Sequence, residues 1–376
     1  MVLFNGTLNT NAITSALYNA IISIDVYAKN IRSNINELVN ANRVDGTLYG
    51  DTKLYTFGDT KFVRDWANDA EGATLLSTAR NKRIKQTKIT IDTFKIIEDT
   101  KDAYLSKQAW MGEGSFSQFH GLLDTLVKET KDIYEYRTYG AFVGTHKAEN
   151  ATINTLTVTV PYVEDLTKRN LLAAEMISNT ISNLFDNGLK DPGNDYNELG
   201  YEMAFTKDDF EFIWKATVKN YINKLGIVGA FNKEQLNYDF QYTLPDKFFG
   251  AVNSSATVGD GSTVRALEYL TLTGSDSKTY EIKAGDLVPS VCTAPAGKSY
   301  TVDGSIALTI MHKDAVPYMS GFNVDTEFFN PKGLYTNKYS IFGRNTLVVN
   351  ALPMIQVKVV FEDAPEEPET PGEGNN

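Results

Sequence analysis

Residues Ser115–Gly140 read SFSQFHGLLDTLVKETKDIYEYRTYG, a stretch in which apolar side chains recur every three or four residues. This spacing places them on one face of a helix. The residues of that face are Phe119, Leu122, Leu123, Leu126, Val127, Ile133 and Tyr134. Ser115 and Gln118 fit a capping box, so the helix is predicted to begin at Ser115, and Gly140 or Gly144 can end it. A helix of this length spans roughly 40 Å.

A second long amphipathic helix is predicted from Ala12 to Ala41, on the order of 45 Å in length. Its apolar face consists of Ile13, Leu17, Ile21, Ile24, Ala28, Ile31, Ile35 and Leu38. Two interpretations of this face stay open. It packs on the subunit's own core, or it forms a stripe for a partner helix.

Two strands are predicted over Thr47–Phe57 and Ile84–Ile97, which are rich in Thr, Tyr, Phe and Ile. The polar connection from Gly58 to Arg83 is too long for a tight turn, so the pair should form an extended excursion. Its returning side is locally basic, with Arg80, Lys82, Arg83, Lys85 and Lys88. This run is a solvated face, a patch that meets an acidic surface of another subunit, or a nucleic-acid contact. The lack of interleaved aromatic residues disfavours the third interpretation.

The rest of the chain alternates between helix and strand, which predicts an α+β fold. Thr155–Val160 has a strict period of two, a helix is expected over Val163–Phe185, and a strand around Glu211 precedes a helix that ends at Gly226. An inserted β element is expected over Gly250–Gly304. Further strands are predicted at Ile306–Met311, Lys338–Phe342, Asn345–Val349 and Ile355–Phe361.

Composition and motifs point away from catalysis. The 376 residues carry a net charge of −11, which argues against a surface built to grip nucleic acid or anionic lipid. The single cysteine, Cys292, cannot form an internal disulfide, and the three histidines lie far apart in sequence. Without a signal-like N-terminus or a long apolar stretch, we expect a protein made in the cytoplasm. No catalytic, cofactor or metal site is predicted.

The order of these parts resembles the major capsid proteins of tailed bacteriophages with the Hong Kong 97 type fold, particularly those of short-tailed phages of Gram-positive hosts. The segment Glu327–Tyr335 with its following aromatic strand resembles their returning C-terminal segment. The resemblance implies the following division: residues 1–44 as an N-terminal arm, 45–102 as an extended loop, 103–160 as the spine helix with the first part of a peripheral domain, 161–304 as an axial domain with a β insertion near 250–304, 305–361 as the return of the peripheral domain, and 362–376 as a disordered acidic tail.

The resemblance further implies a structural protein whose copies form pentamers and hexamers of an icosahedral head around double-stranded DNA. Scaffolding and portal proteins would be its partners, with no cofactor and no membrane, and it would reside in the virion after assembly in the host bacterial cytoplasm. Candidate interface residues are the basic run (Arg80, Lys82, Arg83, Lys85, Lys88) and the N-terminal stripe (Ile13, Leu17, Ile21, Ile24, Ile31, Ile35, Leu38). An encapsulin-like shell protein and a carbohydrate-active enzyme with paired carboxylates remain the alternatives.

Overall fold

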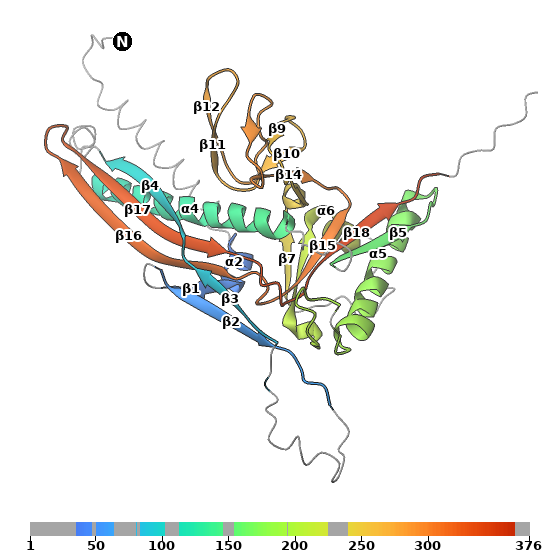
Figure 1. Ribbon diagram of the computed structural model, residues 1–376. Helices are drawn as coiled ribbons and strands as arrows, with labels where there is room; N and C mark the ends of the chain where they lie inside the picture. The colour runs from blue at the N-terminus through green and yellow to red at the C-terminus, as the bar shows by residue number, and fades with distance from the viewer. Residues whose placement is uncertain are drawn as a thin grey trace, which may run out of the picture.

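The fold consists of a four-stranded sheet, a five-stranded sheet, a separate two-stranded sheet and a small β insertion, with a long helix that runs along the first sheet and ends near the second (Figure 1). The computed structural model describes residues 35–46, 50–63, 80, 83–101, 113–145, 154–193, 195–224 and 240–364. Most of the predicted helix over Ala12–Ala41 lies outside these residues. Its described end is the short helix α2, Glu37–Ala41.

The first sheet has four strands and runs alongside the long helix α4, Glu113–Thr145 (Figure 1). Its strands in spatial order are β1 (Arg43–Asp45), β16 (Tyr318–Asn330), β17 (Tyr335–Thr346) and β4 (Thr93–Lys101). β1 is parallel to β16, and the other pairs are antiparallel. A separate antiparallel pair, β2 (Thr52–Gly58) and β3 (Ile84–Thr90), packs against this sheet.

The second sheet has five strands in the order β5 (Thr155–Val160), β18 (Met354–Phe361), β15 (Ile306–His312), β6 (Phe210–Lys215) and β7 (Gln241–Leu244). One face is covered by α5, Leu166–Asn183, through Ala173, Ile177 and Ile181. A π-helical turn, Leu184–Leu189, continues α5, and α6, Ala216–Lys224, follows β6. A 3₁₀ turn, Lys207–Asp209, precedes β6.

The insertion is a compact group of short strands that lies over α4 (Figure 1). It begins after the 3₁₀ turn Asp246–Phe248 and has a small core of its own around Val264, Ala266 and Cys292. Its strands are β8 (Gly250–Val252), β9 (Thr257–Val258), β10 (Val264–Ala266), β11 (Leu270–Thr273), β12 (Thr279–Ile282), β13 (Thr293–Ala294) and β14 (Ser299–Val302). Short strands therefore occupy residues 250–302, within the range where the sequence predicts an inserted β element.

The long helix differs from its prediction at both ends. It begins two residues before Ser115, so the expected capping box is wrong, and it continues past Gly140 and Gly144 to Thr145. Neither glycine ends the helix, and at Gly140 a Cβ atom would meet Leu244 at an ordinary contact distance of 3.5 Å. A Cβ atom on Gly144 would collide with the Phe248 carbonyl oxygen. This glycine therefore lets the helix approach the insertion closely.

Several strand predictions need correction. The run Ile84–Ile97 divides at Ile91–Asp92 into β3 and β4, which belong to different sheets. Asn345–Val349 forms no separate strand, because its first two residues end β17. The 13-residue strand β16 was not anticipated. Thr155–Val160 is confirmed, with Val158 and Val160 buried on one face.

The predicted domain boundaries cut through the five-stranded sheet. They assign β5, β15 and β18 to the peripheral domain and β6 and β7 to the axial domain, yet all five strands hydrogen-bond in one sheet. β16 and β17, which fall in the same predicted range 305–361, belong to the four-stranded sheet beside the long helix, together with β1 and β4. Which sheet a strand joins is set by hydrogen-bonding partners that lie far away in the sequence.

The buried acid Glu211 joins the N-terminal segment to the five-stranded sheet. Phe210, Phe212 and Trp214 of β6 face α5, whereas Glu211 points to the opposite face and is only 2% exposed. The Asn42 side-chain amide donates to its carboxyl oxygen at 2.7 Å. Burial raises the pKa of Glu211 from its ordinary 4.5 to about 7, against the opposing effects of the Asn42 amide and of Lys313.

Replacement of Glu211 by Gln should stabilise the protein at about pH 8 and much less at about pH 5. A carboxyl whose folded pKa is raised favours folding fully below pH 4.5 and loses this contribution as the pH rises through 7. Each tenfold change in proton affinity corresponds to about 1.4 kcal/mol, so Glu211 lowers the free energy of unfolding at high pH by at most about 3 kcal/mol. Chemical denaturation at both pH values measures the difference.

Glu98→Gln, at an exposed position of β4, is the matched control and should show the same small difference at both pH values. If Glu211→Gln is less stable than the parent protein at the higher pH, the account of Glu211 as a destabilising buried charge is wrong.

Candidate subunit-interface surfaces

The paired strands β2 and β3 separate the basic run onto two faces. Their register pairs Phe57 with Lys85 and Leu54 with Lys88. Because alternate residues of a strand point to opposite faces, Lys85 and Lys88 point in opposite directions. Both are exposed, as are the apolar Leu54 and Ile84 on the Lys88 face. The two lysines therefore do not form one patch, and the Lys88 face combines charge with apolar surface.

Arg83 is engaged within the subunit. Its guanidinium pairs with the Asp59 carboxylate and lies over the Tyr201 ring. The backbone N–H of Glu202 also donates to Asp59, and the Thr60 hydroxyl donates to the Glu202 carboxylate. Burial raises the pKa of Asp59, but the Glu202 N–H and Arg83 outweigh it and hold the pKa below its ordinary value. Arg83 and Asp59 lie where β2 ends and β3 begins, a junction that we call the base of the excursion. Their contacts fasten this junction to residues 201–202.

The other candidate residues divide into described and undescribed ones. Arg80 is exposed, and Lys82 lies outside the described residues. Of the N-terminal stripe, Ile35 is half-buried and Leu38 lies in the subunit's own core with Val39 and Tyr139. Leu38 therefore packs in the core of its own chain and is not a candidate interface residue. The remaining stripe residues, Ile13, Leu17, Ile21, Ile24 and Ile31, lie outside the described residues.

The outer face of the four-stranded sheet is an apolar surface that the sequence analysis missed. Phe342 and Arg344 contact Tyr134 of α4, so the alternate residues of β17 face away from the helix. On that outer face Val324, Ile341 and Ile96 lie abreast. Ile96 is 49% exposed, and Phe328 further along β16 is 62% exposed. We call Ile96, Val324, Ile341 and Phe328 the outer strip.

The outer strip continues a buried cluster. This cluster consists of Ile89 of β3, Ile91, which follows β3, and Met319 of β16, with Phe94 packed against them. The Phe94 ring meets Phe322 edge to face at a centroid distance of 5.6 Å. The β2–β3 pair thus covers the near end of this face and leaves the far end open. Exposed apolar side chains in a row on a protruding sheet are typical of an interaction surface.

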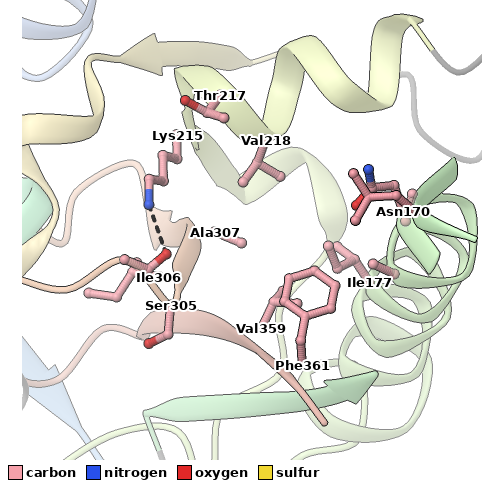
Figure 2. A pocket seen from close by; sticks show the side chains of 14 residues that line it. Asn170, Ile177, Lys215, Thr217, Val218, Ser305, Ile306, Ala307, Val359 and Phe361 are labelled. Atoms are coloured by element: carbon pink, nitrogen blue, oxygen red, sulfur yellow. Dashed lines mark hydrogen bonds between the residues drawn. The ribbon is translucent and has the colours of Figure 1, made fainter. Parts of the chain in front are cut away.

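A groove of about 370 Å³ lies between α5, α6 and the five-stranded sheet (Figure 2). Its walls are mostly apolar, with Ile177, Val218 and Val359 facing the space. The buried Lys215 ammonium donates to the Gly304 carbonyl at 2.8 Å. Among the residues that line the groove there is no carboxylate, so it does not supply the paired acids of the carbohydrate-active alternative.

The described residues contain no group of three or more His, Cys, Asp or Glu side chains arranged to hold a metal ion. No described helix is long and apolar enough to cross a membrane.

Comparison with known proteins identifies the fold. No protein-family model and no curated protein sequence matches the chain. A chain in the capsid structure of Staphylococcus phage Andhra superposes with a TM-score of 0.60 at 12% identity, covering 86% of this chain and 84% of that chain. A chain in the structure of the head fiber and inner core protein gp22 of native bacteriophage P68 gives a TM-score of 0.56 at 12% identity, over 85% and 83%.

The chain therefore has the fold of chains found in these phage structures, and the α+β fold of the Hong Kong 97 type is confirmed. At 12% identity the likeness lies in the fold.

Replacement of Asp59 by Ala should loosen the base of the excursion without unfolding the body. The loss of the acceptor frees the Arg83 guanidinium and the Glu202 N–H. Hydrogen exchange at the amides of residue 59, Thr60 and Glu202 should rise at least about tenfold, because a hydrogen bond to a charged group contributes about 1.5–3 kcal/mol. β15 and β18 should keep their protection.

Asp92→Ala, at an exposed position between β3 and β4, serves as the control and should leave these three amides unchanged. Equal exchange in the two variants would show that Asp59 does not hold the excursion.

Proposed function

We propose that the chain is a major capsid protein whose copies assemble into the pentamers and hexamers of an icosahedral phage head. The observation that carries this proposal is the fold shared with a chain of the Andhra capsid structure over 86% of the sequence. The same proposal assigns the molecule a structural role without an active site.

The exposed surfaces support self-assembly independently of the comparison. The β2–β3 pair packs against the four-stranded sheet through Ile89 and carries the exposed Leu54 and Ile84. The outer strip is likewise uncovered by the chain's own described residues. Neighbouring copies in a closed shell would bury both surfaces, which favours assembly because each fully buried large apolar side chain contributes about 1.5–3 kcal/mol.

Partners and location follow from this role. We infer that a scaffolding protein and a portal protein act with the chain during assembly in the host bacterial cytoplasm, and that the product is part of the virion. Double-stranded DNA would be enclosed without sequence-specific binding. The net charge of −11 supports this, because an acidic shell does not hold packaged DNA tightly.

The direct test is expression of the chain alone and together with a scaffold encoded beside its gene. Negative-stain electron microscopy and sedimentation should show closed shells or capsomer rings. A neighbouring portal or terminase gene would separate a phage head from an encapsulin-like shell. A stable monomer of about 42 kDa under both conditions would overturn the proposal.

Joint reversal of Arg80, Lys85 and Lys88 to Glu should weaken assembly, most strongly at low salt, if these residues meet an acidic surface of a neighbour. Arg83 is left intact because it holds the base of the excursion. Three exposed ion pairs of about 0.5–1 kcal/mol each correspond to about tenfold or more in association. The yield of shells in sedimentation measures the effect.

The matched control reverses three exposed lysines elsewhere, Lys168, Lys278 and Lys283. Normal assembly of the Arg80/Lys85/Lys88 variant at both low and high salt would exclude the charge-pairing role.

Replacement of Ile96 and Phe328 by Ser should prevent assembly and leave the subunit folded. Both side chains are largely exposed in the subunit, so its unfolding midpoint should change little. If a neighbour buries them, the interface loses about 3–6 kcal/mol. Thermal unfolding and sedimentation, measured on the same preparation, separate the two effects.

Val258→Ser with Val360→Ser, which removes exposed apolar side chains away from the outer strip, is the control. Shells formed equally well by both double variants would remove the outer strip from the assembly interface.

A further inference from the structure

A second cavity, of about 240 Å³, lies where α4, the four-stranded sheet and the insertion meet. Thr138 and Phe142 of α4 form one wall, and Arg344 and Thr346 of β17 form another. The insertion contributes the rest of the lining, with Leu267, Glu268, Gly297 and Lys298. In contrast to the groove beside α5, polar and charged side chains dominate this cavity.

Arg344 is a buried cation that has no counter-ion among the described residues. It is 7% exposed, and its described polar contacts are to Tyr134, whose hydroxyl accepts from Nε at 2.7 Å and whose ring lies 5.0 Å from the guanidinium carbon. Within the described part of the chain, no carboxylate lies within ion-pair distance of Arg344. Its two terminal nitrogens therefore keep their hydrogen-bonding capacity. A buried charge is costly unless it is paired and hydrogen-bonded.

A second polar group at the cavity wall also lacks a partner. The Thr346 hydroxyl oxygen is buried and forms no hydrogen bond with any described residue. Buried side-chain polar atoms are almost always hydrogen-bonded, so an unpartnered hydroxyl two residues from Arg344 on the same face of β17 marks an incomplete site. This observation is independent of the charge on Arg344.

The charges that surround the cavity leave room for an anion. Lys298 at the rim pairs with Glu268 at 2.7 Å, and both side chains are partly exposed. This pair is balanced, so the positive charge of Arg344 remains uncompensated within the lining. The lining supplies the guanidinium fork of Arg344 and the Thr346 hydroxyl from β17, and the Lys298 ammonium from the insertion. Such a donor set suits a tetrahedral oxyanion, because arginine presents parallel N–H groups that match its oxygens.

We propose that this cavity is a binding site for a small oxyanion of the phosphate class, held by Arg344 with help from Thr346 and Lys298. The bound anion would join the four-stranded sheet, which supplies Arg344 and Thr346, to the insertion, which supplies Lys298. Thr138 and Phe142 of α4 would line the site beside it. Binding would therefore stabilise the folded chain against unfolding.

The test is thermal unfolding of the full chain while phosphate replaces chloride at constant ionic strength, with acetate as a planar carboxylate for comparison. The midpoint should rise saturably with phosphate and less with acetate. Arg344→Gln should bind phosphate at least about tenfold more weakly, as expected for the loss of a charge-assisted hydrogen-bonded contact. An exposed-lysine control, Lys278→Gln, should respond as the parent chain does.

Thr346→Val keeps the test decisive if Arg344→Gln does not fold. This nearly isosteric variant removes the unpartnered hydroxyl, so its midpoint in chloride should equal or exceed that of the parent chain, whereas its affinity for phosphate should fall. The proposal is overturned if phosphate stabilises the parent chain no more than chloride does. It is equally overturned if the folded variants at positions 344 and 346 bind phosphate with unchanged affinity.

Discussion

The C-terminal end of α4 is enclosed by three separate parts of the chain. Tyr139, Ala141 and Val143 share one core with Phe248 and Tyr300 near the insertion, with Ile213 and Met354 of the five-stranded sheet, and with Tyr318 of β16. Side chains at successive positions of a helix point in different directions, so no single sheet could cover all of them. The five-stranded sheet and the insertion also have apolar clusters of their own, but each part contacts this one helix end, and their relative placement follows from it.

Other parts of the molecule extend outward from the core around the C-terminal end of α4. β16 and β17 extend along α4 far from the five-stranded sheet, and the β2–β3 pair projects in another direction (Figure 1). The Tyr139 hydroxyl donates to the Val316 carbonyl at 2.7 Å just before β16 begins, which ties the strand's start to the helix. The outer strip can therefore be presented at a defined angle although it lies far from the shared core.

Local patterns in the sequence predicted single elements well and their association poorly. The period-two run Thr155–Val160 and the helical spacing of α5 are recovered because each depends on one covered face. β16 escaped notice because its outer half is exposed and mixes Asp325, Thr326 and Glu327 with aromatic residues, which gives no alternation. The five-stranded sheet joins segments up to about 200 residues apart, and no local pattern encodes such pairing.

The candidate surfaces show the same limit. Sequence proximity grouped Arg83, Lys85 and Lys88 into one basic run, but the two lysines are three residues apart on β3 and therefore point to opposite faces. Arg83 meets Asp59, 24 residues earlier, because the two strands of the excursion end side by side. The outer strip could not have been read from sequence, since its members come from β4, β16 and β17 and become neighbours only in the folded sheet.

The buried charges are placed at the joints between these parts. Glu135 of α4 pairs with Arg43 of β1 at 2.7 Å, Glu211 meets Asn42, and Arg344 joins β17 to Tyr134 of the helix. Apolar packing tolerates small rotations of one layer on another, whereas a buried hydrogen bond to a charged group is lost within a few tenths of an ångström. Burying these groups costs stability, and in exchange they select one orientation at each joint. In the proposed shell, exposed surfaces must fit identical neighbours, and a defined orientation at each joint matters more for that fit than additional stability does.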